Sequence, residues 1–270
     1  PHDRAIIYST IRPFLSVIGR ATDVQMALGD YTGPTKVSHK SYKPQVKGDI
    51  AAITEAVKML SKAKKPIIYA GGGVVNSGPG ASKLLTNFTQ MTGFPITLTL
   101  MGLGAYPAAD EQYLGMLGMH GTYEANMAMH HSDLILAVGA RFDDRVTNGV
   151  DKFCPTAKII HVDIDPASIS KTIQADVPIV GPAKHVLQEL IELVKGSKKQ
   201  PGKESIDYWW QQIEGWRGRH GGRFRTDDSE LMKPQQVIEM LSKVTKGDAY
   251  VCSDVGQHQM FAAQYYKFNK

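Results

Sequence analysis

Cysteine and long apolar runs are scarce in this sequence. The two cysteines, Cys154 and Cys252, lie far apart and form no CxxC pair, which argues against a disulfide framework or a zinc site and fits a reducing compartment. No apolar run approaches the length that crosses a membrane, so we expect no membrane contact. The sequence also lacks a Gly-x-Ser-x-Gly elbow, a His-Glu-x-x-His motif and a P-loop, which leaves common hydrolase and kinase functions without support.

What is present is an ordinary globular composition, with 42% hydrophobic and 21% charged residues. The net charge of +5 reflects lysines that concentrate in residues 36–65 and 195–203, and aromatic residues do not interleave with them. We therefore expect no nucleic-acid partner, and an anionic phosphate cofactor explains the basic residues better. The chain begins with Pro1, which predicts a fragment, a processed product or a trimmed chain.

Apolar runs alternate with helical patterns from Asp49 onward, and this order predicts an α/β fold with a parallel sheet flanked by helices. Asp49 is the expected N-cap of the first helix, and Gly93 the expected end of another. Strands are expected at Pro66–Ala70, Pro95–Leu100, Asp133–Val138, Lys158–Asp163 and Val177–Gly181. Further helices are expected at Pro79–Thr92, Thr122–His130 and Pro182–Val194.

The C-terminal part of the sequence predicts a second, truncated α/β unit. Lysine, glycine and proline in Gly196–Ser205 indicate a linker before a helix at Ile206–Trp216. Beyond it we expect a helix from Pro234, a strand at Ala249–Ser253 and a helix at Gln257–Tyr266. The predicted divisions are an unassigned segment 1–41, an α/β domain 42–195, a linker with a helix 196–232, and a truncated unit 233–270.

Glycine-rich loops follow two of the predicted strands. Gly71-Gly72-Gly73 could let a phosphate or a flat ring approach the backbone, although the spacing departs from GxGxxG and a plain tight turn is the alternative. The run from Thr99 to Gly104 also places glycines at the carboxyl end of a strand, where ligands of parallel sheets bind, against the alternative of a simple connection.

The run from Gly115 to Asn148 combines methionines, histidines and charged residues around one strand. Its methionines suit contact with an aromatic ring but are more often core residues, and His120 is better suited to a cofactor hydrogen bond than to metal ligation. Arg141 and Arg145 could bind a diphosphate. Asp143 and Asp144 could orient these arginines or accept ribose hydroxyls, with surface ion pairing as the alternative.

Two further segments carry weaker signals. We expect Asp163 to contact a ligand and Asp165 to cap a helix. The amides of Ser253–His258 could hold an anion where a strand gives way to a helix.

With these runs the chain resembles the large, catalytic subunit of acetolactate synthase, also called acetohydroxyacid synthase. The resemblance covers residues 42–270 and includes KKPIIYAGGG, TLMGLGAYP, LGMLGMHGTYEANMAMHHSD, AVGARFDDRVTN, HVDIDPASISK, DYWWQQIE, KPQQVIEML, KGDAYVCSDVGQHQMFAA and YYKFNK. It implies a thiamine-diphosphate enzyme that condenses two pyruvates, or pyruvate and 2-ketobutyrate, to 2-acetohydroxy acids with loss of carbon dioxide, in valine, leucine and isoleucine synthesis. It also implies Mg²⁺, an FAD that undergoes no net redox change, a homodimer or homotetramer, a possible regulatory small subunit, and a cytoplasmic or organelle-matrix location.

Carried over motif by motif, the resemblance assigns no catalytic residue and no metal ligand within this chain. Thiamine diphosphate contacts are expected from Gln257 and His258. FAD contacts are expected from Gly71, Gly72, Gly73, Thr99, Leu100, Met101, Gly102, Leu117, Gly118, Met119, His120, Gly139, Ala140, Arg141, Phe142, Asp143, Asp163 and Ile164.

The sequence departs from the family pattern in ways that matter for activity. Gly181-Pro182 stands where the family has Gly-Asp near the flavin, and residues 1–30 match no family segment. The glutamate that activates the aminopyrimidine and the Gly-Asp-Gly…Asn motif that binds Mg²⁺ are both missing, so we expect no acetolactate from this chain alone. The alternatives are a non-enzymatic FAD- or nucleotide-binding module and another thiamine-diphosphate carboligase or oxidase.

Overall fold

Short, fully buried apolar runs form the strands of this protein. The computed structural model describes residue 28 and residues 45–197, 202–220 and 231–269. Residues 44–270 make one compact unit. Its strands are β1 Pro66–Ala70, β2 Ile96–Leu98, β3 Tyr113–Met116, β4 Leu134–Val138, β5 Lys158–Asp163 and β6 Val177–Val180.

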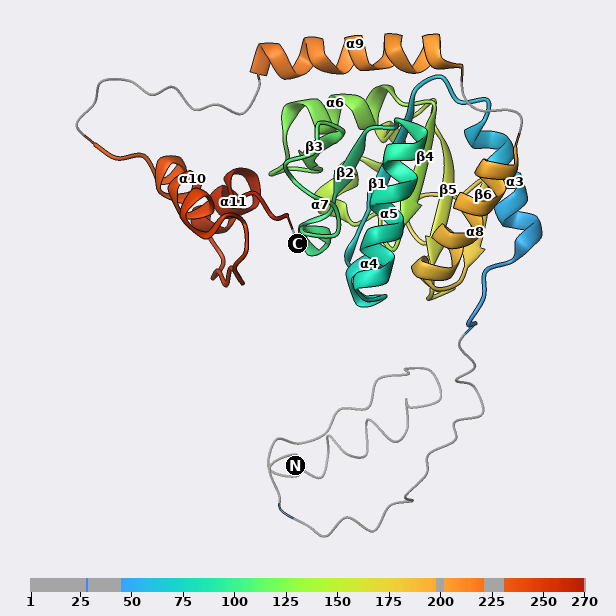
Figure 1. The fold of residues 1–270 in the computed structure, drawn as a ribbon, viewed down its shortest axis with the longest axis horizontal. Coiled ribbons are helices and arrows are strands. Elements are labelled where there is room, and N and C mark those ends of the chain that lie inside the picture. Colours follow the sequence, from blue (N-terminus) through green and yellow to red (C-terminus); the bar gives the residue numbers. More distant parts are fainter. Residues whose placement is uncertain (1–27, 29–44, 198–201, 221–230, 270) are drawn as a thin grey trace, which may run out of the picture. The chain divides into compact units, whose positions relative to one another are not determined.

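All neighbouring strands pair in parallel, in the order β3-β2-β1-β4-β5-β6. Chain connections run outward in one direction from β1 and in the other from β4, so the topological switch point lies between these two strands. In such doubly wound sheets, ligands bind in the crevice beyond the carboxyl ends of the strands at the switch point. The expected α/β fold with a parallel sheet is therefore confirmed (Figure 1).

Helices cover both faces of the sheet. They are α3 Ile50–Leu60, α4 Gly72–Asn76, α5 Pro79–Thr92, α6 Tyr123–His131, α7 Asp144–Thr147, α8 Ala183–Gly196, α9 Lys203–His220, α10 Pro234–Thr245 and α11 Gln257–Tyr265, with 3-10 turns η1 Leu100–Gly102 and η2 Val150–Lys152. The sequence signals act as expected at two ends: the Asp49 carboxylate accepts from the Ala51 N–H at 2.7 Å, and Gly93 ends α5 with φ 71°.

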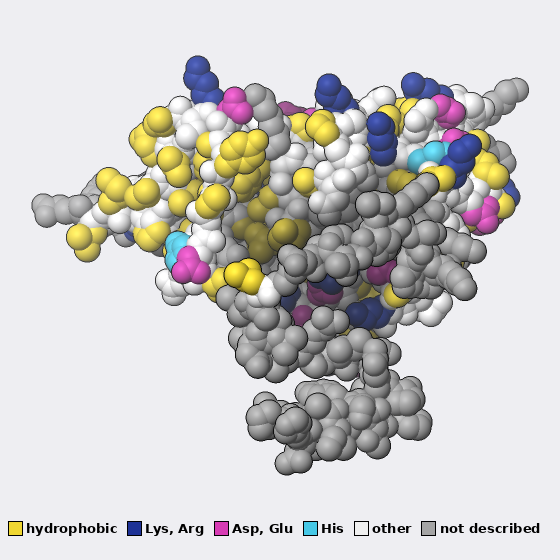
Figure 2. Space-filling view, turned by 90° about the horizontal axis from the view of Figure 1, so that it is seen from below, with side chains coloured by type: hydrophobic (Ala, Val, Ile, Leu, Met, Phe, Trp, Pro, Cys, Tyr) yellow, Lys and Arg dark blue, Asp and Glu magenta, His cyan; other side chains and the backbone are white. Residues whose placement is uncertain are grey.

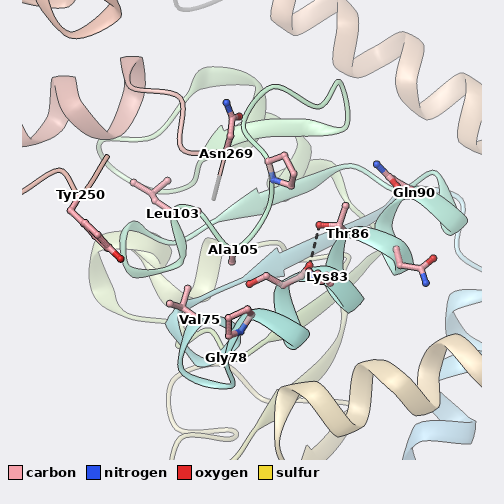
Figure 3. Close-up of a pocket in the computed structure, with 14 residues that line it drawn as sticks. Val75, Gly78, Lys83, Thr86, Gln90, Leu103, Ala105, Tyr250 and Asn269 are labelled. Carbon is pink, nitrogen blue, oxygen red and sulfur yellow. Dashed lines mark hydrogen bonds between the residues drawn. The ribbon is translucent and has the colours of Figure 1, made fainter. Parts of the chain in front are cut away.

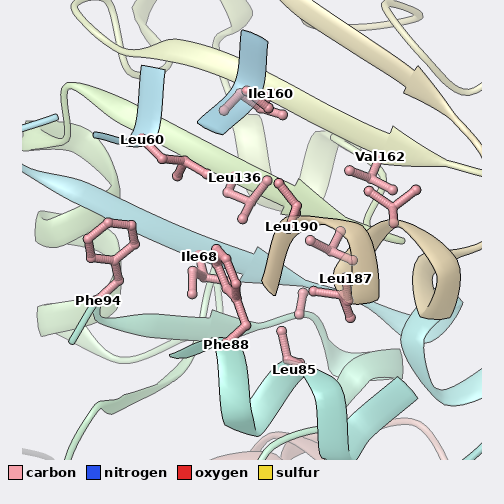
Figure 4. Close-up of a cluster of buried hydrophobic side chains, with 14 of the residues drawn as sticks. Leu60, Ile68, Leu85, Phe88, Phe94, Leu136, Ile160, Val162, Leu187 and Leu190 are labelled. Atoms are coloured by element: carbon pink, nitrogen blue, oxygen red, sulfur yellow. The ribbon is translucent and has the colours of Figure 1, made fainter. Parts of the chain in front are cut away.

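Alternating residues of each strand enter two separate cores. Ile68 of β1 joins α3, α5 and α8 in one core, in which Leu85 and Leu190 also lie (Figure 4). Tyr69, its neighbour in sequence, faces the opposite core with α6 and α9. A strand buried on both faces in this way has no polar alternation, which is why the runs read as continuous hydrophobic segments.

Helix α9 packs on the sheet face that Tyr69 points to and is an integral part of the fold. Trp209 is fully buried, its indole Nε1 donates to the Pro66 carbonyl at 3.0 Å, and the helix packs along α6 (Figure 1). The helix also extends beyond the expected Ile206–Trp216 at both ends. The division of residues 42–270 into separate domains stays a prediction.

Two expectations about local structure need correction, and one strand was missed. Ala249–Ser253 is not a strand, because no strand in the described part of the chain pairs with this segment. Within it, Tyr250 is fully exposed. Pro95–Leu100 yields only the short β2, since residues 100–102 turn into η1. Strand β3 was not expected from the sequence, and it is a short edge strand that contains Gly115. Residues 1–27 lie outside the described part.

Candidate functional site

The expected flavin contacts all follow the carboxyl end of a strand. Gly71–Gly73 follow β1, Thr99–Gly102 follow β2, Leu117–His120 follow β3, Gly139–Asp143 follow β4, and Asp163 and Ile164 end and follow β5. Because the strands are parallel, their carboxyl ends share one edge of the sheet. This edge is the one from which α4 departs in Figure 1.

At the switch point, the loops after β1 and β4 are in direct backbone contact. A Cβ placed on Gly71 would lie 2.4 Å from the Gly139 oxygen, and one on Gly73 would lie 2.6 Å from the Gly139 Cα. Gly139 itself has φ 57°, which favours glycine. The glycines thus permit this close approach, which is more than a plain tight turn.

The Gly73 amide does not remain available for a phosphate. Its N–H donates to the Gly139 carbonyl at 2.9 Å, and the Gly71 N–H donates to the Val138 carbonyl at 3.0 Å. The expectation that these amides cradle a phosphate therefore loses its physical basis at Gly71 and Gly73. Helix α4 is only one and a half turns long and adds no strong dipole.

The loop after β4 presents charge outward and apolar side chains inward. The Arg141 guanidinium lies 3.1 Å from the Asp143 carboxylate, and both side chains are exposed. Phe142 between them is buried against the rings of Tyr69 and His161. Solvent screening leaves the ion pair weak, so Arg141 is free to exchange its partner for an anionic ligand.

Tyr69 and His161 were not expected at the site. The Tyr69 hydroxyl donates to the Arg141 carbonyl at 3.2 Å, and His161 Nε2 lies 3.0 Å from the Ala140 carbonyl. Burial raises the pKa of the Tyr69 phenol and lowers the pKa of the His161 imidazole, so both side chains are neutral near pH 7. The sequence offers only one signal for them: polar side chains within buried strands need a partner.

The loop after β3 is tied to the loop after β4. The Met119 N–H donates to the Arg145 carbonyl at 2.9 Å, and Asn126 of α6 brackets Gly118 with hydrogen bonds to its N–H and its carbonyl. These bonds hold Met119 and His120 outward, and both are exposed. Two of the expected flavin loops therefore form one connected structure.

Large apolar side chains stand exposed along this same edge. The exposed fractions are 76% for Met101, 54% for Met119 and 53% for Ile164. Figure 2 views the molecule from this side and shows hydrophobic side chains beside basic and acidic ones. Exposed apolar groups mixed with a few charges are typical of a surface that binds a ligand or another part of the protein.

Two other methionines of the run Gly115–Asn148 have structural roles. Met116 and Met129 are buried in or beside the cores, and the Leu117 side chain is buried as well. Leu117 and Phe142 can therefore offer a ligand only backbone atoms. Methionine as core filler, the alternative weighed from the sequence, holds for these two positions.

The acidic residues after β5 form a turn. The Asp163 carboxylate accepts from the Asp165 N–H at 2.9 Å, and the Asp165 carboxylate accepts from the Ala167 N–H at 2.9 Å. The expectation that Asp165 caps a helix is wrong, because residues 166–170 form turns and no helix begins there. Pro182, which stands in place of the family's aspartate, is the N-cap residue of α8.

Gln257 and His258 lie in the first turn of α11, and both are exposed. The helix is joined to the loop after β3, because the Gln264 amide donates to the His120 carbonyl at 2.6 Å. The two residues expected to contact thiamine diphosphate thus belong to a helix that touches the edge of the expected flavin loops.

A large cavity lies beside these loops and is lined by none of the expected contacts. It has a volume of about 940 Å³ (Figure 3). One side is the outer face of α5, with Lys83, Thr86 and Gln90, and the other includes Leu103 and Tyr250. A cavity of this size suits a small molecule, but its position does not coincide with the expected flavin site.

Within the described ranges, no group of three or more His, Cys, Asp and Glu side chains is placed to hold a metal ion. No helix among those same residues is long and apolar enough to span a membrane.

Comparison with known proteins gives a consistent result. Residues 53–190 match the family described as "Thiamine pyrophosphate enzyme, central domain". The chain is 52% identical over 240 residues to the acetolactate synthase isozyme 3 large subunit of Escherichia coli K12, which covers 89% of this chain and 41% of that protein.

Two further relatives carry related names. Identity is 50% over 264 residues to the acetolactate synthase large subunit of Buchnera aphidicola subsp. Schizaphis graminum, covering 97% of this chain and 45% of that protein. Because this alignment extends into residues 1–30, the expectation that these residues match no family segment is wrong. Identity is 53% over 243 residues to the Haemophilus influenzae large subunit, covering 89% and 41%. The chain spans less than half the length of these relatives. It belongs to the thiamine pyrophosphate enzymes, and residues 53–190 are their central domain.

Proposed function

We propose that this chain is part of an acetolactate synthase large subunit and supplies its FAD-binding central domain. The observation that carries the proposal is the convergence of all expected flavin loops on one sheet edge, around the switch point between β1 and β4. Identity of about half the aligned residues to large subunits supports the same activity.

The residues at this edge fit an FAD in chemistry. Arg141 offers a planar donor for the diphosphate, and Met101, Met119 and Ile164 offer apolar surface for a flat ring. Among the described residues, the N–H groups of Ala140 to Asp143 donate no hydrogen bond, whereas the carbonyls of Gly139 to Arg141 all accept one. A ligand with acceptor atoms would accept hydrogen bonds from these N–H groups.

Thiamine diphosphate would contact Gln257 and His258 from the first turn of α11, and when bound its thiazolium supplies the carbanion chemistry of the reaction. The substrates we propose for the whole enzyme are pyruvate and 2-ketobutyrate. The described residues offer no cluster that fits Mg²⁺, so we assign it no ligand here. We further propose a homo-oligomer, with a possible regulatory subunit, in the cytoplasm or an organelle matrix.

Flavin titration tests the proposed cofactor. We expect the 270-residue chain to quench FAD fluorescence on binding and to leave NADH fluorescence unchanged. Arg141→Ala should weaken FAD binding about tenfold or more, because a charge-assisted hydrogen bond contributes ~1.5–3 kcal/mol. Lys158→Ala is the matched control, since this exposed cation lies at the amino end of β5. Equal loss in both variants, or no quenching by the parent chain, contradicts the assignment.

A segment exchange tests the activity. The aligned segment of the Escherichia coli large subunit is replaced by this chain, and acetolactate formed from pyruvate is measured colorimetrically with FAD, thiamine diphosphate and Mg²⁺. A second exchange uses the Haemophilus influenzae segment as control, which is 53% identical to this chain over the aligned region. Activity in the control together with none in the test protein counts against the proposed reaction.

The competing function is a nucleotide-binding module without thiamine chemistry. It uses the same sheet edge, but it gives no reason for the match to a thiamine pyrophosphate enzyme domain or for identity that extends through α10 and α11. Another thiamine-diphosphate carboligase or oxidase would be recognised in the segment exchange by loss of acetolactate.

A further inference from the structure

Three consecutive carbonyls of the loop after β4 are each held by a different element. The Gly139 carbonyl accepts from the Gly73 N–H of α4 at 2.9 Å. The Ala140 carbonyl accepts from His161 Nε2 of β5 at 3.0 Å, and the Arg141 carbonyl accepts from the Tyr69 hydroxyl of β1 at 3.2 Å. Strands β1 and β5 flank β4 in the sheet, so the loop after β4 is hydrogen-bonded from both sides.

Ring packing reinforces these hydrogen bonds. The Phe142 ring lies 5.6 Å from the Tyr69 ring and 5.2 Å from the His161 ring, with the second contact edge to face. All three side chains are buried, so the contacts exclude water. Such aromatic pairs favour one mutual orientation, which adds geometric definition to the burial of apolar area.

The imidazole of His161 is specialised for one hydrogen bond. A carbonyl can only accept, so Nε2 carries the proton and Nδ1 is left with a bare lone pair. Nδ1 is buried without a partner among the described residues. A histidine used only as core filler gains nothing from this arrangement, because an unsatisfied buried acceptor costs stability.

We propose that Tyr69 and His161 are positioning residues for flavin binding: they fix the carbonyls of Ala140 and Arg141 inward and thereby aim the Arg141 guanidinium and the loop N–H groups at the cofactor. This inference rests on the proposed FAD site. Neither side chain touches the flavin in it. They act through the backbone of the loop, which connects buried strand residues to a surface site.

The contacts of Tyr69 and His161 with the carbonyls of Arg141 and Ala140 are called the clamp here. Amide hydrogen exchange of the flavin-free chain tests the clamp without any cofactor. Tyr69→Phe removes one hydroxyl, and His161→Phe removes the donor while keeping a ring. Within residues 139–147, we expect exchange of the hydrogen-bonded amides of Gly139, Val146 and Thr147 to quicken about tenfold in each variant, equivalent to ~1.4 kcal/mol of local opening free energy. His161→Gln, which restores a donor, should recover much of the protection. Unchanged exchange in both Phe variants overturns the inference.

A matched control separates the clamp from general loosening of the core. Tyr106→Phe removes an equally buried hydroxyl on the other side of the sheet. It should leave exchange at residues 139–147 unchanged. If Tyr106→Phe quickens exchange there as much as Tyr69→Phe, the effect is global and the clamp is refuted.

Flavin affinity is the second readout. Tyr69→Phe and His161→Phe should raise the FAD Kd about tenfold, with partial rescue by His161→Gln and no effect of Tyr106→Phe. Quickened exchange with unaltered FAD affinity overturns the positioning role. Absence of FAD binding in the parent chain sinks the proposed function and this inference, whereas retained FAD binding with failed variants sinks the inference alone.

Discussion

Replacing Gly71 by alanine should damage the sheet at the switch point. The new Cβ would lie 2.4 Å from the Gly139 oxygen and 2.7 Å from the Ala140 Cα, distances that Cβ atoms do not tolerate. Neither strand end can withdraw freely. The Gly71 N–H donates to the Val138 carbonyl at 3.0 Å, and the Gly139 N–H donates to the Val162 carbonyl at 2.8 Å.

The cost follows from these contacts. Overpacking of a well-packed interior costs ~1–3 kcal/mol. Movement of about 1 Å to relieve the clash would weaken one or two of the backbone hydrogen bonds, at ~1 kcal/mol each. The free energy of unfolding should therefore fall by about 2–5 kcal/mol, and because each kcal/mol shifts Tm by ~2–4 °C at this size, Tm should fall by roughly 4–20 °C.

Differential scanning calorimetry of the cofactor-free chain measures the effect. Gly215→Ala is the control, because this glycine lies within α9 with nothing within 4 Å of an added Cβ. Removal of a helix glycine there should raise stability by ~0.5–1 kcal/mol. Gly72→Ala should give a smaller loss, since its nearest atoms are 3.2 Å away on Met101. If Gly71→Ala has the same Tm as the parent chain, the loops after β1 and β4 do not approach each other this closely.

Two further predictions concern buried side chains. Burial lowers the pKa of His161 below 6.5, so the unfolded chain binds the proton first as pH falls, and stability should drop below pH 6.5 by up to ~1.4 kcal/mol per pH unit from this residue. Urea denaturation from pH 7.5 to 5.5 gives the slope of the unfolding free energy against pH, and we expect this slope to be smaller in His161→Phe. An identical slope in both proteins argues against the contribution of His161. Trp209→Ala should cost ~3–5 kcal/mol in urea denaturation, because the side chain is fully buried, whereas Tyr208→Phe on the exposed side of α9 should change little. A negligible cost for Trp209→Ala would mean that α9 is a linker.

Local signals made several elements predictable. Proline and glycine marked the bounds of Pro66–Ala70 and Pro79–Thr92, which the structure reproduces. Strand β3 was missed because a four-residue edge strand containing a glycine has no distinctive pattern. Ala249–Ser253 has the apolar character of a strand, but strand formation depends on a neighbour that sequence pattern does not reveal.

The arrangement of the candidate site could be predicted to the level of loops, while its role stays a proposal. Parallel strands bring their carboxyl ends together, so glycine and charge after each strand pointed to one edge of the sheet. The roles of single residues were less accessible. Gly73 serves a backbone contact with Gly139, and Tyr69 and His161 looked like core residues because their partners are loop carbonyls distant in sequence.

The position of α9 determines what intrinsic fluorescence reports. All three tryptophans of the chain lie in this helix. The Trp209 indole donates to the Pro66 carbonyl, the Trp210 indole donates to the Gly93 carbonyl, and Trp216 stacks on His131. The tryptophan emission spectrum therefore reports whether this single helix stays packed against the sheet. A red shift that precedes the loss of far-ultraviolet dichroism would record α9 lifting away while the strands beneath it stay folded.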